Sequence, residues 1–244
     1  MTSPAGAARR SRAGRTLGVL LLVLSAAASS GAAEPSEFSP AEKLVFTEHH
    51  LANVKTATSL RYRFVKAGSL ESGFEDEVRV DVTPNARGQS AVSGNFLSGE
   101  RRETMPAIDE AQSNPAILYF LEHDIREMER LTKGKSNYFR KRIRMAMAEG
   151  ASVRDTTVQY RGESLAAKEV SLAPYESDPM RNRFEKYATK RYVFVIASGV
   201  PGGLYQIRTS LPGALPGDAP VLEETMTLAG SEPVARAATP KKKP

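Results

Sequence analysis

Residues 190–211, KRYVFVIASGVPGGLYQIRTSL, have the pattern of a β-hairpin. In the first arm Tyr192, Phe194 and Ile196 fall on one face, and apolar residues alternate with polar ones in the second arm as well. Between the arms lie four residues that favour a tight reversal, Gly199, Pro201, Gly202 and Gly203. Because a lone two-stranded hairpin is only marginally stable in water, these arms are predicted to belong to a larger sheet.

Strand patterns on both sides of this hairpin predict the rest of that sheet. Seven further segments are predicted as strands, and in most of them apolar residues alternate with charged or polar ones. These segments span residues 59–66, 74–82, 92–96, 101–105, 156–160, 166–172 and 222–228. Together with the two arms of the hairpin they make about nine strands. Neighbouring strands that are joined by short turns must be antiparallel.

Three helices are predicted between these strands. The first covers residues 40–52, because a capping Ser39 is followed by Pro at the first helical position and by Glu42. The second covers residues 114–134, between an Asn-Pro start and a Gly stop, and the third covers residues 136–148. Two of the three helices thus lie in the middle of the chain.

One acidic residue interrupts the apolar stripe of the second helix. Asp124 projects inside this stripe. The predicted stripe is formed by Ile117, Leu118, Leu121, Ile125, Met128 and Leu131. An unpaired carboxylate there would cost several kcal/mol, so Asp124 either meets a cation or borders a wet cavity.

The third helix carries a basic side. Arg140, Lys141 and Arg144 lie opposite Phe139 and Ile143, and no acid lies among them. We predict that these cations hold an anionic headgroup or touch an anionic membrane surface. The alternative is a solvated cationic face on a packed helix.

The first 33 residues have the features of a secretory signal peptide. Four arginines precede an apolar run over residues 17–28, which is shorter than the roughly 20 residues of a membrane-spanning helix. Cleavage near Ala33 would leave a soluble periplasmic or secreted protein. We predict one domain over residues 34–229 and a disordered Ala, Pro and Lys tail over residues 230–244.

The composition argues against several functions. The chain has no Cys, which excludes disulfides and thiol chemistry, and the four arginines before Ala33 account for most of its net charge of +6. We therefore predict no nucleic-acid binding. There is no Gly-rich phosphate loop and no G-x-S-x-G motif, and the adjacent His49 and His50 are expected at the surface. No catalytic residue, metal site or cofactor is predicted.

The predicted fold class is α+β: a curved antiparallel sheet, or half-barrel, with a leading helix and two mid-chain helices that cover its concave face. This order of elements, over residues 39–228, resembles that of the LolA/LolB-like periplasmic lipoprotein carriers. No residue role is transferred from that family. The resemblance implies an apolar cavity that holds acyl chains between the inner membrane and an acceptor.

The leading functional hypothesis is a carrier or binding protein for an apolar ligand, either a lipid or an acylated protein. The predicted cavity is lined from the sheet and the second helix by Tyr62, Phe64, Val78, Val80, Ile117, Leu121, Ile125, Phe194 and Ile196. The alternative is a non-catalytic structural or interaction protein of the cell envelope whose own side chains fill that space. An enzyme that acts on envelope glycan or lipid through carboxylates is the third hypothesis.

Overall fold

The computed structural model describes residues 38–87, 89–215 and 217–234. The predicted signal peptide and residues 235–244 of the predicted tail lie outside this part of the chain. The domain boundaries given above stay predictions.

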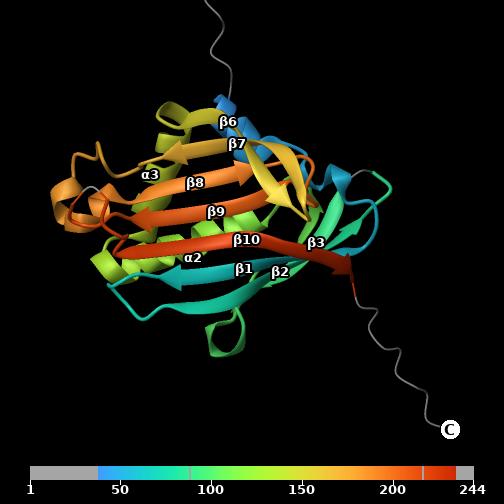
Figure 1. Cartoon of the computed structure of the whole chain (residues 1–244), viewed down its shortest axis with the longest axis horizontal. Helices are drawn as coiled ribbons and strands as arrows, with labels where there is room; N and C mark the ends of the chain where they lie inside the picture. The colour runs from blue at the N-terminus through green and yellow to red at the C-terminus, as the bar shows by residue number, and fades with distance from the viewer. Residues whose placement is uncertain (1–37, 88, 216, 235–244) are drawn as a thin grey trace, which may run out of the picture. The chain divides into compact units, whose positions relative to one another are not determined.

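Within the described residues, ten antiparallel strands form one open sheet (Figure 1). Their order across the sheet is β4-β3-β2-β1-β10-β9-β8-β7-β6, and β5 pairs with β3. The strands are β1 (Thr58–Ala67), β2 (Phe74–Pro84), β3 (Ser90–Phe96), β4 (Glu103–Thr104), β5 (Ile108–Ala111), β6 (Ser152–Tyr160), β7 (Glu163–Leu172), β8 (Arg191–Ile196), β9 (Leu204–Leu211) and β10 (Leu222–Pro233). The predicted α+β half-barrel is confirmed, with one more strand than the sequence indicates.

The hairpin of residues 190–211 forms β8 and β9, and Phe194 lies opposite Ile207. Its reversal uses Gly202 and Gly203, whose φ angles of 73° and 70° lie in the left-handed region that favours glycine. Both residues of the pair Phe194 and Ile207 are fully buried, as the alternation predicts. The hairpin therefore contributes its apolar face to the core.

The last strand is longer than its sequence pattern indicates. β10 continues to Pro233 because its end pairs with the start of β1, where Thr58 lies opposite Pro233. Residues 230–233 thus belong to the sheet rather than to the predicted tail.

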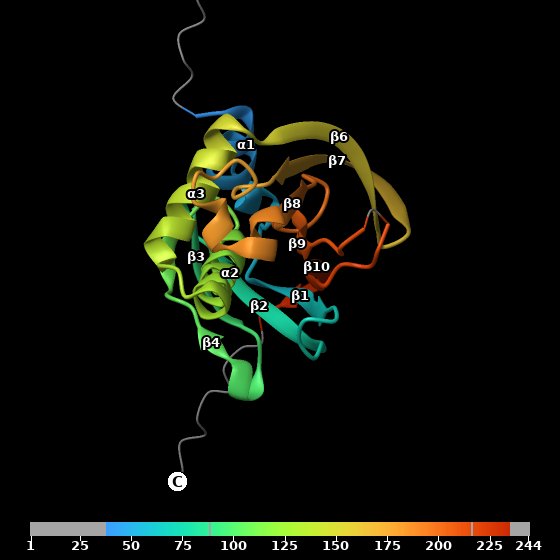
Figure 2. The ribbon, with the colours of Figure 1, turned by 90° about the vertical axis from the view of Figure 1, so that its left-hand side faces the viewer.

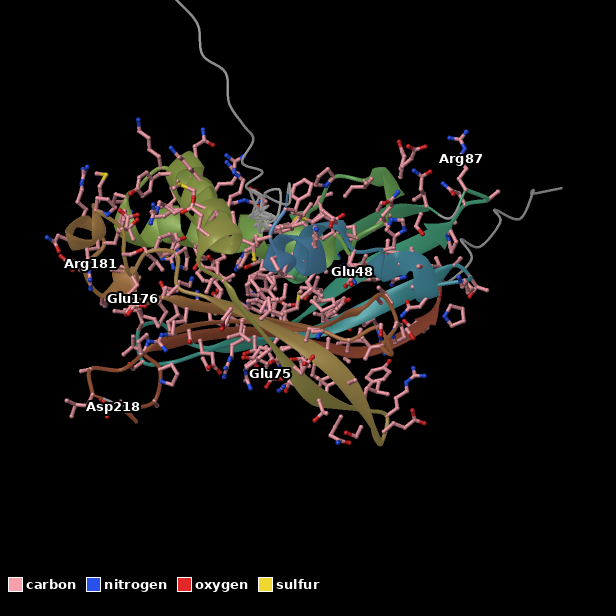
Figure 3. All side chains as sticks on the ribbon, turned by 90° about the horizontal axis from the view of Figure 1, so that it is seen from above. Glu48, Glu75, Arg87, Glu176, Arg181 and Asp218 are labelled. Atoms are coloured by element: carbon pink, nitrogen blue, oxygen red, sulfur yellow. The ribbon has the colours of Figure 1, made fainter. Side chains whose placement is uncertain are left out.

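The helices lie along one face of the sheet, where α2 (Ala116–Thr132) crosses behind the strands in Figure 1 and α3 (Ser136–Glu149) flanks it in Figure 2. Figure 3 shows this helical layer above the strands, with charged side chains around the outside. Ser39, at the start of the leading helical segment, donates from its hydroxyl to the Met147 carbonyl of α3 at 3.0 Å. The helices therefore cover the concave face of the sheet.

The predicted leading helix is interrupted. It forms α1 (Pro40–Glu42) and a π-helical turn, η1 (Lys43–Thr47), and a separate 3-10 turn follows, η2 (His50–Asn53). The break lies at Glu48, whose backbone is extended. An α-helix would direct the Glu48 amide to the Leu44 carbonyl, but that carbonyl lies 2.8 Å from Nε2 of His50. The buried imidazole of His50 thus occupies the carbonyl that the next helical hydrogen bond would use, and the helix ends there.

Short 3-10 turns complete the described structure. They are η3 (Gly99–Arg101), η4 (Arg181–Arg183) and η5 (Glu185–Thr189). Of the strand predicted over residues 101–105, only Glu103–Thr104 pairs with β3 as β4, and Arg101 belongs to η3. The chain between β7 and β8 holds η4 and η5 against the end of the helical layer (Figure 2).

Candidate functional site

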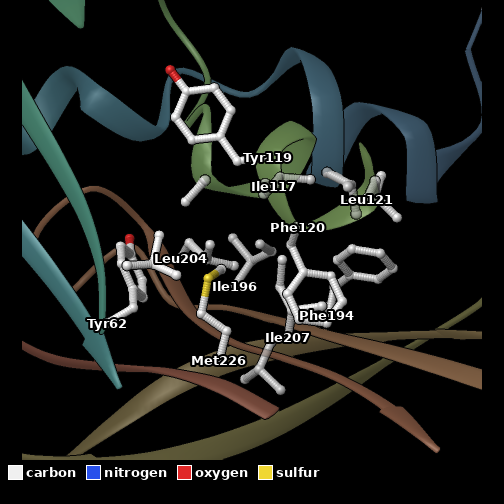
Figure 4. Packing of buried hydrophobic residues seen from close by; sticks show 14 of the residues in the cluster. Tyr62, Ile117, Tyr119, Phe120, Leu121, Phe194, Ile196, Leu204, Ile207 and Met226 are labelled. Carbon is white, nitrogen blue, oxygen red and sulfur yellow. The ribbon is translucent and has the colours of Figure 1, made fainter. Parts of the chain in front are cut away.

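The nine residues predicted to line a cavity lie together in the interior. Each is at most 6% exposed and belongs to one apolar core. Figure 4 shows Tyr62, Phe194 and Ile196 on the strands, with Ile117 and Leu121 of α2 opposite them. The structure thus brings the sheet residues and the helix residues together. Their role as the lining of a ligand cavity stays a prediction.

Aromatic side chains fill much of the space between the sheet and α2. The Phe96 ring centroid lies 5.6 Å from that of Phe64, 6.3 Å from that of Phe120 and 4.7 Å from that of His123. Phe120 is fully buried in this cluster, although the predicted stripe did not include it. The interior at this end is a packed core.

Asp124 meets a cation, which decides between the two alternatives left by the sequence. Its carboxylate accepts a hydrogen bond from Lys190 Nζ and a second one, at 2.7 Å, from the hydroxyl of Tyr192. Asp124 and Lys190 are each at most 2% exposed. Burial and the charge of Asp124 raise the pKa of Tyr192 well above its usual value. The cluster joins α2 to the start of β8.

A second buried cation joins α2 to the sheet one turn further on. Lys66 Nζ lies 2.9 Å from carboxylate oxygens of Glu71 and Glu127 and 3.4 Å from Glu224. Although burial opposes the shift, hydrogen bonds from Arg130 and Lys66 lower the pKa of Glu127 to about 2. Both charged clusters hold the C-terminal half of α2 in place.

An open apolar cavity lies instead on the outer side of the helical layer. Its volume is about 300 Å³, which is at the lower end of the range for small-ligand pockets. We call it the helical groove, and its lining residues are Phe38, Glu42, Phe46, Thr47, Leu118, Leu121, Glu122, Ile125, Arg140, Ile143 and Arg144. Leu121 and Ile125 are the two predicted lining residues that reach it. The groove is formed by the leading helical segment, α2 and α3.

Two large apolar side chains in the lining of this groove are exposed. Leu118 is 46% exposed and Phe38 is 41% exposed. The sequence places Leu118 in the buried stripe of α2, and this prediction is wrong because the apolar arc of α2 is wider than the surface that the sheet covers. The width of that arc is the sequence signal for the groove.

The three cations on the basic side of α3 differ in their contacts. Arg140 forms a bidentate ion pair with Glu122 of α2, with N–O distances of 2.9 and 2.8 Å. This ion pair lowers the pKa of Glu122. Within the described chain, Lys141 and Arg144 form no ion pair with a carboxylate, and Arg144 lines the groove. The prediction missed the acid that faces Arg140 because it lies on another helix.

His50 is buried rather than at the surface, which corrects the sequence prediction. Beside the contact of Nε2 with the Leu44 carbonyl, its Nδ1 accepts a hydrogen bond from the Asn114 amide at 3.2 Å. Burial lowers the pKa of His50, so the neutral imidazole is favoured.

No group of three or more potential metal ligands converges among the described residues. No helix in the same part of the chain is long and apolar enough to span a membrane.

The structure is an α+β half-barrel with an apolar groove on its helices. Lipoprotein LppX of Mycobacterium tuberculosis matches 78% of this chain and 94% of its own, with 12% identity and a TM-score of 0.33. The MucA/MucB complex of Pseudomonas aeruginosa matches over 82% of this chain and 59% of that chain, with 11% identity and a TM-score of 0.35.

A LolA superfamily protein from Nitrosomonas europaea also matches, over 79% of this chain and 93% of that one, with 8% identity and a TM-score of 0.22. The order of elements in the sequence resembles that of the same superfamily. No protein-family model and no curated protein matches the sequence.

Proposed function

We propose that this chain is a periplasmic or secreted binding protein that holds an acyl chain of a lipid or an acylated protein in the helical groove. The observation that carries the proposal is the apolar cavity of about 300 Å³ between three helical segments, beside the exposed side chain of Leu118. Exposed apolar surface of this kind, rimmed by charged residues, is typical of ligand grooves.

The groove suits part of a single acyl chain, both in the free energy of its burial and in volume. Each methylene transferred from water to an apolar surface contributes about 0.8 kcal/mol, so about eight methylenes would contribute about 6 kcal/mol. Arg144 at the rim would add attraction for an anionic headgroup, whereas the charge of Arg140 is already compensated by Glu122. The small volume favours a single chain over a lipid with several chains.

The test is uptake of a fluorescent fatty acid by the purified protein and its Leu118→Asp variant. Leu118 is exposed and lies in the first turn of α2, where a carboxylate is compatible with the helix dipole. We expect the substitution to abolish uptake while thermal unfolding stays unchanged. Leu215→Asp is the matched control, because Leu215 is 69% exposed and lies outside the groove. Equal uptake by all three proteins would contradict the proposal.

A second candidate is a non-catalytic interaction protein of the envelope. The packed interior favours it, because the residues predicted to line a large cavity form a filled core. Mass spectrometry of protein purified under native conditions distinguishes the two functions. Bound lipid is expected if the helical groove holds an acyl chain. The absence of both bound lipid and fatty-acid uptake would leave the interaction protein as the better account.

A further inference from the structure

A second cavity lies at the turn that joins α2 to α3. Its volume is about 310 Å³, and no residue of the helical groove lines it. We call it the cationic pocket, and its lining residues are Thr132, Lys133, Gly134, Lys135, Tyr138, Met180, Arg183 and Phe184. It is formed by the end of α2, the start of α3 and the chain that contains η4.

The charge of this pocket is one-sided. Lys133, Lys135 and Arg183 line it, and none of them forms an ion pair with a carboxylate of the described residues. The lining contains no acid. Glu129, on the last turn of α2, lies nearby and accepts a hydrogen bond from the Ser136 hydroxyl. Among the described residues the three cations therefore have no ion-pair partner, in contrast to Arg140, which pairs with Glu122.

The wall of the pocket is held in place by hydrogen bonds. The Tyr138 hydroxyl donates to both oxygens of Asp178, at 2.7 and 2.8 Å, and Asp178 accepts from the Met180 amide at 2.7 Å. Arg142 pairs with the same carboxylate at 2.8 Å, so the acid is already compensated. Because Asp178 is buried, these contacts fix the η4 segment against α3.

The lining of the pocket also includes an aromatic surface and the start of a helix. The Tyr138 and Phe184 ring centroids lie 5.7 Å apart. Lys135 is the N-cap residue of α3, and its side chain does not cap the helix. The free amides of a first helical turn carry partial positive charge, which adds to that of the three cations.

We infer that the cationic pocket binds a phosphate group whose attached organic part lies on the aromatic wall. Several cations around one cavity match the multiple charges and oxygens of a phosphate better than the single charge of a carboxylate. Tyr138, Phe184 and Met180 would contact the carbon atoms next to the phosphate. The group is either the headgroup of a phospholipid or part of a free phosphate compound. The site is separate from the groove and does not depend on the proposed function.

The test uses Lys133→Gln, Lys135→Gln and Arg183→Gln together in the full protein, with ³¹P NMR titration of inorganic phosphate. The matched control replaces Lys43, Lys55 and Arg102 by Gln, which removes the same number and kinds of charge from exposed positions that have no ion pair among the described residues. We expect phosphate affinity to fall at least about tenfold in the pocket variant, because charge-assisted hydrogen bonds are lost, and to change less than about twofold in the control. Unchanged affinity in the pocket variant, or an equal loss in the control, would overturn the inference.

Binding to vesicles distinguishes a phospholipid headgroup from a free phosphate compound. Wild-type protein and pocket variant are sedimented with phosphatidylglycerol or with phosphatidylcholine vesicles. A loss of binding to phosphatidylglycerol vesicles in the pocket variant assigns the site to a lipid headgroup. Unchanged vesicle binding, together with lost phosphate binding, assigns it to a free phosphate compound. Leu118→Asp should leave phosphate affinity unchanged, so failure of the groove and failure of this pocket give different results.

Discussion

The interior between sheet and helix and the helical groove are both apolar, yet the protein uses them differently. Phe194, Ile117 and Tyr62 meet in a closed core, whereas Leu118 and Ile143 border an open cavity. Helix α2 contributes to both. We infer from this comparison that the concave face of the half-barrel supplies stability, and we propose that the helical groove is the surface that binds a ligand.

The largest effect is expected in the interior. Phe194→Asp should destabilise the fold by at least about 4 kcal/mol, because it removes a fully buried ring and buries an unpaired charge. Urea unfolding followed by circular dichroism measures the change. Leu215→Asp, at an exposed site, is the control. A Phe194→Asp protein within about 1 kcal/mol of wild type would mean that this face is not a packed core.

The buried ion pair between α2 and β8 should be nearly as sensitive. Lys190→Met leaves Asp124 without its cation and should cost about 3–5 kcal/mol. The double variant Asp124→Leu with Lys190→Met should recover most of this loss, because no buried charge remains. The test is to measure the free energies of unfolding of Lys190→Met, of Asp124→Leu and of the double variant. An equal loss in Lys190→Met and in the double variant would show that the ion pair does not anchor α2.

A moderate effect is expected from pH at His50. Because burial lowers the pKa of His50 in the folded protein, its contribution is fully present above about pH 6.5, the value in the unfolded chain. Stability is then lost as the pH falls below 6.5 toward the folded pKa, by at most about 1.4 kcal/mol per pH unit. Urea unfolding between pH 5 and 7.5 should show a shallower slope for His50→Gln than for His49→Gln. Identical slopes would contradict this assignment.

The smallest effects are expected on the basic side of α3. Arg140→Gln should cost no more than about 1 kcal/mol of stability and leave binding to anionic vesicles unchanged, because Glu122 already pairs with the guanidinium. Lys141→Gln with Arg144→Gln should weaken that binding by about 2 kcal/mol, or about thirtyfold, at low salt. Vesicle sedimentation at low and moderate salt measures both. If Arg140→Gln weakened vesicle binding as much as the double variant does, the ion pair with Glu122 would not compensate the charge of Arg140.

Much of the fold follows from local patterns. The alternation around Tyr62, Phe194 and Ile207 predicts which strand faces are buried, because side chains of a strand alternate between its two faces. The spacing of Ile117, Leu121 and Ile125 predicts the buried side of α2, because residues four apart lie on the same face of a helix. The short strand β5 has too few residues to show alternation, and the break at Glu48 depends on a contact from His50.

The sites depend on contacts between distant segments, and the sequence predicts them less well. Asp124 is recognisable as an exception on its helix. Its partner Lys190 lies between η5 and β8, and no local period connects that position to α2. The same holds for Arg140 and Glu122. The helical groove combines Phe46, Leu118 and Ile143 from three segments, so only the excess width of the apolar arc on α2 indicates it.

The most direct test of the central claim is to locate a bound acyl chain. The protein is irradiated with a photoreactive fatty acid, digested, and the labelled peptides are identified by mass spectrometry. We expect adducts on residues 116–125 of α2 and residues 138–144 of α3, and their loss in Leu118→Asp but not in Leu215→Asp. Adducts on the β1 and β8 peptides that contain Phe64 and Phe194, with none on α3, would place the ligand in the interior and contradict this account.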